Sequence, residues 1–115
     1  MYKRQATSAV REAPNGREFI NRVQSDLGIQ IELISGSEEA RLIYLGVLSG
    51  MALEDEYYVI IDIGGGSTEL ILADEKDAIA LTSSRVGAVR LKNDFFLDNA
   101  PVSYTHLTLP TIYSV

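Results

Sequence analysis

The sequence contains no cysteine, so neither a disulfide framework nor a thiolate zinc site is available to this chain. It also lacks an apolar run approaching the roughly 18 residues of a transmembrane helix, and its N-terminus has no signal-peptide core. Basic residues are few, because 10 Lys and Arg stand against 16 Asp and Glu, for a formal net charge of −6. Nucleic acids and anionic membranes require a cationic face, so we expect neither as a partner and expect a soluble, cytoplasmic protein.

The composition that remains is that of a small globular domain. Of the 115 residues, 46% are hydrophobic and 23% are charged, which is enough for one modest core. In so acidic a chain, an anionic ligand must be met locally, by backbone N–H groups, by one or two arginines, or by a metal.

Both ends of the sequence differ from its middle. If MYKRQ is written as the codons GTG TAT AAG AGA CAG, the reverse complement read in another frame encodes Val-Ser-Tyr-Thr, as residues 102–105 do. The ends therefore resemble one sequencing-adapter sequence translated from opposite strands. We expect residues 1–5 and 101–115 to be non-native and residues 6–100 to be a domain fragment. His106, the single histidine, lies in this tail, and we assign it no chemistry.

Hydrophobic periodicity predicts alternating helices and strands, which is typical of an α/β protein with a sheet covered on at least one face. In the first half we expect a short helix that ends near Pro14, a helix over 17–27 stopped by Gly28, and a strand over 29–34. A helix capped by Ser35 or Ser37 follows and ends just before Gly50. The second half has extended runs over 57–63, 68–73 and 77–83, with a turn at 74–76, and a final helix over 87–96.

The run VIIDIGGGSTEL, residues 59–70, ends a hydrophobic strand in an acid followed by Gly64, Gly65 and Gly66. Consecutive glycines permit positive φ and bring backbone N–H groups close to an anion, while Ser67 and Thr68 add hydroxyl donors. The flanking acids, Asp62 and Glu69, supply hard oxygens suited to Mg²⁺ that bridges to phosphate. The alternative is a tight glycine hairpin with solvated acids at its rim. We favour a phosphate site, because three glycines exceed what a two-residue turn requires.

Two acids, Glu38 and Glu39, open the helix that follows ISGS. Acids in a first turn complement the helix dipole, and Ser35 with Glu38 has the spacing of a capping box. The functional alternative makes one carboxylate a general base that holds a water near a phosphorus atom. The residues alone favour the structural role.

Arg11 and Glu12 lie side by side in the short helix SAVREA. A solvated surface ion pair, which contributes little stability, is the default interpretation. The alternative is that Arg11 binds an oxyanion in bidentate fashion. Arg11 alone does not decide between them.

Four segments together resemble the Ppx/GppA family of exopolyphosphatases and guanosine pentaphosphate phosphohydrolases: ATSAVREAPNGREFINRV, IELISGSEEARLIYLGV, VIIDIGGGSTELIL and SSRVGAVRLKNDFF. The resemblance covers nearly all of residues 6–97. A lone DIGGGST is weakly specific, because the superfamily of sugar kinases, Hsp70 and actin uses similar loops. DIGGGSTEL after ISGSEEARLI at this spacing is specific.

The resemblance implies a partial actin-like, ribonuclease-H-like lobe, with a mixed sheet and helices. It also implies a homodimeric, Mg²⁺-dependent hydrolase that releases the terminal phosphate of polyphosphate or guanosine pentaphosphate (pppGpp) by attack of water, without indicating which of the two is used. The family's roles fall by position on Glu39, which orients the water, on Arg11 in the active-site region, on Asp62 and Glu69 around the metal, and on Gly64, Gly65, Gly66 and Ser67 as the phosphate loop.

The sequence departs from the family in lacking a first phosphate loop of the form D-x-G-S-N-S and a second lobe. We therefore expect little or no hydrolysis by these 115 residues alone. Open hydrophobic strand edges also predict self-association. Two other functions stay open: a sugar-kinase-type phosphotransferase, which the ISGSEEAR helix disfavours, and a noncatalytic module that binds pppGpp with Mg²⁺ and does not turn it over.

Overall fold

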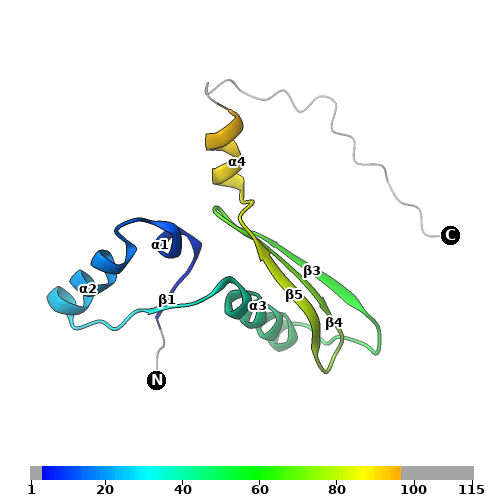
Figure 1. Cartoon of the computed structure of the whole chain (residues 1–115). Coiled ribbons are helices and arrows are strands. Elements are labelled where there is room, and N and C mark those ends of the chain that lie inside the picture. The colour runs from blue at the N-terminus through cyan, green and yellow to red at the C-terminus, as the bar shows by residue number, and fades with distance from the viewer. Residues whose placement is uncertain (1–3, 97–115) are drawn as a thin grey trace.

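A computed structural model describes residues 4–96 of the chain (Figure 1). Its elements are β1 (Gln5–Ala6), α1 (Ser8–Glu12), α2 (Gly16–Leu27), β2 (Glu32–Leu33), α3 (Gly36–Gly50), β3 (Tyr58–Ile63), β4 (Thr68–Ala73), β5 (Ala78–Ser84) and α4 (Ala88–Phe95). The α/β class is confirmed, and each expected helix and strand is present. The sequence did not predict β1.

The helix ends follow the expected capping residues. Gly28 has a left-handed φ of 64° and its amide donates to the carbonyl of Gln24, so it ends α2 as predicted. Of the two serines proposed as the cap of α3, Ser35 has the role, because its Oγ accepts from the amide of Glu38 at 3.1 Å. Gly50 was expected just beyond the end of α3, whereas it is the last residue of that helix, so α3 ends one residue later than predicted.

The strands form two sheets that share no strand. β1 and β2 are a short parallel pair, whereas β3, β4 and β5 form an antiparallel sheet in that order. The strand expected over 29–34 is reduced to Glu32–Leu33, because its partner β1 offers only two residues for pairing. The chain passes through α3 from the small sheet to the large one, as Figure 1 shows.

One face of the large sheet carries the core. Ile71 and Ala73 of β4 are fully buried and belong to one cluster with Ala40 and Tyr44 of α3. The hydroxyl of Tyr44 donates to the carbonyl of Asp74 at 3.1 Å, which ties α3 to the turn between β4 and β5. The predicted cover on at least one face is therefore α3.

The opposite face of the large sheet is apolar and exposed within the described residues. Its side chains include Val59, Ile61, Ile63, Leu70 and Leu72, which are 39% to 68% exposed. The alternation along each strand places these residues opposite the core positions. Among residues 4–96, no helix has both the length and the apolarity needed to cross a membrane.

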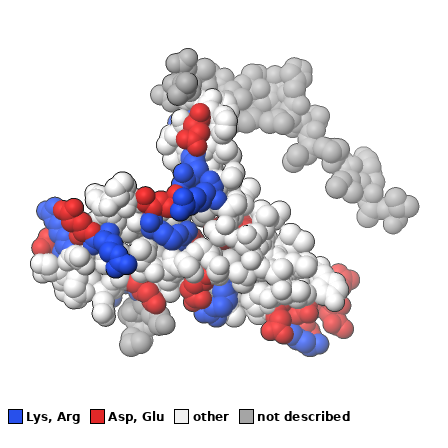
Figure 2. All heavy atoms as spheres, in the orientation of Figure 1, with Lys and Arg blue, Asp and Glu red and all other residues white. Residues whose placement is uncertain are grey.

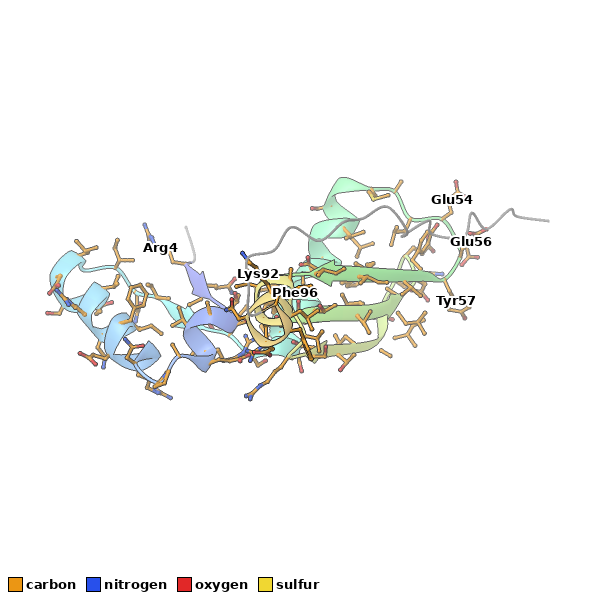
Figure 3. All side chains as sticks on the ribbon, turned by 90° about the horizontal axis from the view of Figure 1, so that it is seen from above. Arg4, Glu54, Glu56, Tyr57, Lys92 and Phe96 are labelled. Carbon is orange, nitrogen blue, oxygen red and sulfur yellow. The ribbon has the colours of Figure 1, made fainter. Side chains whose placement is uncertain are left out.

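The large sheet has two distinct ends. In Figure 3, Lys92 of α4 and Phe96, which follows that helix, lie toward one end, while Glu54, Glu56 and Tyr57 lie at the other. The turn between β3 and β4 is at the α4 end, because it is hydrogen-bonded to the first turn of that helix. The candidate site is at this end.

Candidate active site

The glycine loop, defined here as Gly64 to Ser67, connects β3 to β4 as expected. It does not use the positive φ that consecutive glycines permit, since Gly28 is the only residue with positive φ between residues 4 and 96. Close approach requires glycine instead. A Cβ on Gly66 would lie 2.1 Å from the Oγ of Ser8 in α1. A Cβ on Gly87, just before α4, would lie 2.4 Å from the carbonyl group of Gly65.

The start of α4 binds the carbonyl oxygens of the glycine loop. At 2.9 to 3.2 Å, Ala88 N donates to Gly64 O, Val89 N and Arg90 N donate to Gly65 O, and Arg90 Nε donates to Gly66 O. In a planar trans peptide the C=O and the following N–H point in opposite directions. The N–H groups of Gly65, Gly66 and Ser67 therefore point away from these donors, and they make no hydrogen bond within residues 4–96. Three successive amides are left available to a ligand.

Thr68 and Ser67 differ in their surroundings. The hydroxyl of Thr68 donates to the carbonyl of Val86, so in this structure it stabilises the segment before α4. Ser67 is 3% exposed and lines the cavity described below.

The two flanking acids face each other across the β3–β4 pair. Asp62 and Glu69 are directly opposite in the antiparallel register, which puts both side chains on one face of the sheet. Glu69 is 1% exposed, and its Oε1 accepts from the Oγ of Ser83 in β5 at 2.7 Å. Asp62 is exposed at the rim. The hairpin alternative, with solvated acids, therefore describes Asp62 and not Glu69.

The two carboxylates offer the hard oxygen donors that divalent cations such as Mg²⁺ prefer. No cluster of three or more His, Cys, Asp or Glu side chains able to enclose an ion occurs in the described part of the chain. Mg²⁺ needs no such cage, because it keeps several waters and binds through one or two carboxylates plus phosphate oxygens. Asp62 and Glu69 fit that requirement.

Arg11 holds Glu39 instead of its neighbour in sequence. Its Nη1 donates to Oε2 of Glu39 at 3.2 Å and to the carbonyl of Ile34 at 2.9 Å. The two side chains are only 23% and 18% exposed. The expected surface pair between Arg11 and Glu12 is therefore wrong, because adjacent helical residues point about 100° apart. The Nη2 and Nε groups of Arg11 make no hydrogen bond within residues 4–96.

Glu12 forms its ion pairs with the segment around the start of α4. Its Oε2 accepts from Nη2 of Arg90, and its Oε1 lies 3.8 Å from Nε of Arg85. Figure 2 shows acidic and basic side chains side by side where α1 meets α4.

The two glutamates that open α3 have different partners. Glu38 accepts two hydrogen bonds from Arg41, each at 2.8 Å, and hydrogen bonding to this carboxylate raises the pKa of Arg41. The structural interpretation is confirmed for Glu38, whose amide is also capped by Ser35. Glu39 instead accepts a hydrogen bond from Arg11, as described above.

A cavity of about 310 Å³ lies between α1, the start of α3 and the adjoining ends of β4 and β5. Its lining residues are Arg11, Glu12, Gly36, Ser37, Ser67, Leu81, Thr82, Ser83 and Arg85. Two predicted site residues, Arg11 and Ser67, thus share one cavity. Glu39 and Glu69 are each hydrogen-bonded to a lining residue, whereas Asp62 and the three loop glycines do not line it.

The sequence did not identify three residues of this region. Ser83 holds Glu69, and Arg90 holds both Glu12 and the glycine loop. Gly36 lets α3 begin against β5, since a Cβ there would lie 2.6 Å from the side chain of Ser83. The only sequence signal for Ser83 and Arg90 is their place in the segment SSRVGAVRLKNDFF.

Free amides in a glycine loop, two facing carboxylates and a shielded Arg–Glu pair are features typical of α/β domains that bind phosphate groups. The sequence pattern of the Ppx/GppA phosphatase family matches residues 5–108, and the chain belongs to this family. The resemblance noted from the sequence is thereby confirmed. The domain limits expected at residues 5 and 100 stay predictions.

Individual relatives agree with the family assignment. The chain is 40% identical over 92 residues to a guanosine-5'-triphosphate,3'-diphosphate pyrophosphatase of Photobacterium profundum, with 80% of this chain and 18% of that protein covered. An exopolyphosphatase structure from Cytophaga hutchinsonii has a TM-score of 0.77 and 36% identity over 79% of this chain and 29% of its own. The Ppx/GppA enzyme of Aquifex aeolicus has a TM-score of 0.68 and 33% identity over 84% and 32%. The chain thus spans 18% to 32% of these relatives' lengths.

Proposed function

We propose that this chain is part of a hydrolase that releases the terminal phosphate from polyphosphate or pppGpp by attack of water. The observation that carries the proposal is the glycine loop, whose three carbonyls are bound by α4 and whose three following amides are left without a partner among residues 4–96. The names of two relatives, an exopolyphosphatase and a guanosine-5'-triphosphate,3'-diphosphate pyrophosphatase, support the substrate class.

Phosphate binding is assigned to Gly64, Gly65, Gly66 and Ser67, with Thr68 at the edge of the loop. Phosphoryl transfer depends mainly on positioning and on electrostatic stabilisation of the oxygens that carry charge. Amides fixed by their own peptide carbonyls need no reorganisation when the anion arrives. Arg11 adds its Nη2 and Nε donors, which face no partner within the described residues.

We assign to Glu39 the role of a general base that orients the attacking water. A general base must be held in one orientation, and Arg11 provides this through its bond to Oε2 of Glu39. Because the carboxylate is mostly shielded from solvent, few bulk waters compete for its oxygens. A positioned base contributes about 10²- to 10⁴-fold in rate.

Mg²⁺ is assigned to Asp62 and Glu69. When bound, the ion neutralises charge on the phosphoryl oxygens and so lowers the barrier to displacement. Ser83 fixes the orientation of the Glu69 carboxylate by donating a hydrogen bond to its Oε1. Because the chain spans less than a third of its relatives, we expect little hydrolysis from these 115 residues alone.

The test uses a chimera in which residues of this chain replace the matched 92-residue segment of the Photobacterium profundum relative. Orthophosphate release is measured from polyphosphate and from pppGpp. Glu39→Gln is expected to lower kcat by about 10²- to 10⁴-fold and to change KM little. Glu38→Gln is the matched control, since Glu38 binds Arg41 on the helix surface, and it should leave kcat nearly unchanged. Asp62→Asn should raise the Mg²⁺ concentration needed for half-maximal rate.

Three outcomes would count against the proposal. Equal losses of kcat and of substrate affinity in Glu39→Gln would remove the water-orienting role. Transfer of phosphate to a sugar would indicate a kinase of the same superfamily. Binding of pppGpp with Mg²⁺ and without turnover would indicate a noncatalytic nucleotide-binding module.

A further inference from the structure

We propose that Arg90 and Glu12 are positioning residues: their ion pair fastens α1 to the glycine loop, so that an anion in the loop stabilises the contact between Arg11 and Glu39. The identity of that anion rests on the proposed function, whereas the fastening itself does not. We call the Arg90–Glu12 pair the α1 clamp.

Arg90 is attached to the glycine loop at two points. Its backbone N–H donates to the carbonyl of Gly65 at 3.1 Å, and its Nε donates to the carbonyl of Gly66 at 3.2 Å. The remaining end of the guanidinium, Nη2, donates to Oε2 of Glu12. One side chain therefore joins the loop to α1, and its planar fork suits two acceptors at fixed angles.

Glu12 lies on the face of α1 that packs against the loop. Ser8 and Glu12 are four residues apart, so they lie on the same side of the helix. Ser8 is 6% exposed, and it is the residue that leaves no room for a Cβ on Gly66. The Glu12 side chain is 17% exposed. Packing at Ser8 and the ion pair at Glu12 thus hold one helix face to the loop and to α4.

Arg11 leaves the same helix in another direction and reaches Ile34 and Glu39. The five-residue α1 is too short to be stable by itself, so its position is set by its contacts. A loop anion bound to the amides of Gly66 and Ser67 would fix the two peptide planes whose carbonyls, those of Gly65 and Gly66, accept from Arg90. Because Arg90 also binds Glu12, a fixed loop would hold α1 in place, and a fixed α1 would hold Arg11 against Glu39.

Arg85 provides an internal comparison. It also faces Glu12, at 3.8 Å, but its side chain is 80% exposed and forms no bond to the glycine loop in the described residues. Solvent-exposed ion pairs of this kind contribute little. If a positive charge near Glu12 were sufficient to hold α1, replacing Arg85 or Arg90 would have the same effect. The clamp instead predicts that only the replacement of Arg90 loosens α1.

The test is hydrogen–deuterium exchange of the full 115-residue chain, read by mass spectrometry, with and without tripolyphosphate and Mg²⁺. Without ligand, Arg90→Met and Glu12→Gln are each expected to speed amide exchange in residues 8–12 by about tenfold. Arg85→Met is the matched control and should change it by less than about twofold. In the unsubstituted chain, tripolyphosphate should slow exchange in both the glycine loop and α1. In Arg90→Met it should slow exchange in the loop only.

The clamp is overturned if both substitutions leave the exchange of α1 unchanged, or if tripolyphosphate protects α1 in Arg90→Met as strongly as in the unsubstituted chain. Failure of tripolyphosphate to protect the loop in the unsubstituted chain counts against the proposed function, while the ligand-free comparison still decides the clamp. Glu12→Gln keeps the bond from Arg90 to Gly66, so it carries the comparison should far-ultraviolet circular dichroism show that Arg90→Met does not fold.

Discussion

Arg11 donates to Glu39 at 3.2 Å, although the two residues are 28 positions apart in the sequence. The same Nη1 also donates to the carbonyl of Ile34, so one guanidinium group joins α1, the segment after β2 and the first turn of α3. Both side chains are mostly shielded from solvent. The contact therefore holds the small sheet's helices near the large sheet and fixes the proposed catalytic carboxylate at the same time.

Replacing Arg11 with Lys tests this joint. Lysine keeps the charge but lacks the planar fork, so it cannot serve the carbonyl of Ile34 and the carboxylate of Glu39 with the same geometry. We expect Arg11→Lys to lower the free energy of unfolding by about 1 to 2 kcal/mol. Urea titration followed by circular dichroism measures it. Arg22→Lys, in the exposed pair with Asp26, is the control, and an equal loss there would contradict the prediction.

Substitution of Gly66 tests the close approach of α1 to the glycine loop. In Gly66→Ala the new Cβ meets the Oγ of Ser8 at 2.1 Å, so we expect a loss of about 1 to 3 kcal/mol. Adding Ser8→Ala should recover part of it, because the Cβ of Ser8 is 3.4 Å away. Thermal melting of Gly66→Ala, Ser8→Ala and the double variant measures the coupling between the two positions. Gly46→Ala in α3, which meets nothing within 4 Å, should be neutral or stabilising.

The turn after β4 predicts a loss of stability in acid. The pKa of Asp74 is lowered, first by hydrogen bonds from the amide of Asp77, then by those from Lys76. Because the folded pKa is below the unfolded one, the contribution is present above the unfolded pKa, about 3.9, and is lost as the pH falls through the folded pKa.

Urea titrations at pH values from 6 down to 2 should therefore show a decrease in unfolding free energy at the acidic end that is smaller in Asp74→Ala than in the parent chain. Asp26→Ala removes an exposed carboxylate and serves as the comparison. An identical acid dependence in Asp74→Ala and the parent would rule out this source.

The open apolar face of the large sheet predicts self-association. Ile61 and Ile63 are 58% and 68% exposed on β3, which is also an edge strand. We expect the chain to sediment as more than one species, and Ile61→Lys to shift it toward the monomer. Leu45→Lys, on exposed α3 surface, should not shift it. A monomeric parent chain that melts cooperatively would show that the face is tolerated in water.

The helices and strands were predictable because their signals are local. Periodicity located α2 and β4, Ser35 capped α3, and Gly28 ended α2. The two-sheet arrangement was not predictable, since β1 and β2 exist only through their mutual pairing across the intervening helices.

The site residues show the same division. The glycine loop was located from its composition, yet its backbone conformation follows from contacts with Ser8 and Gly87 that no local pattern encodes. Glu39 was separated from Glu38 by the family resemblance, and its partner Arg11 was first assigned to the adjacent Glu12. Pairs formed by residues far apart in the sequence, such as Ser83 with Glu69, leave no mark on either segment alone.

The carbonyls of Gly64 and Gly65 serve as acceptors for the first amides of α4. A helix of eight residues does not persist in water without such support, so the helical content of α4 is a gauge of loop geometry. A spectroscopic label at exposed Phe95, one full helix length from the loop, would register a rearrangement of the glycines without entering the site itself.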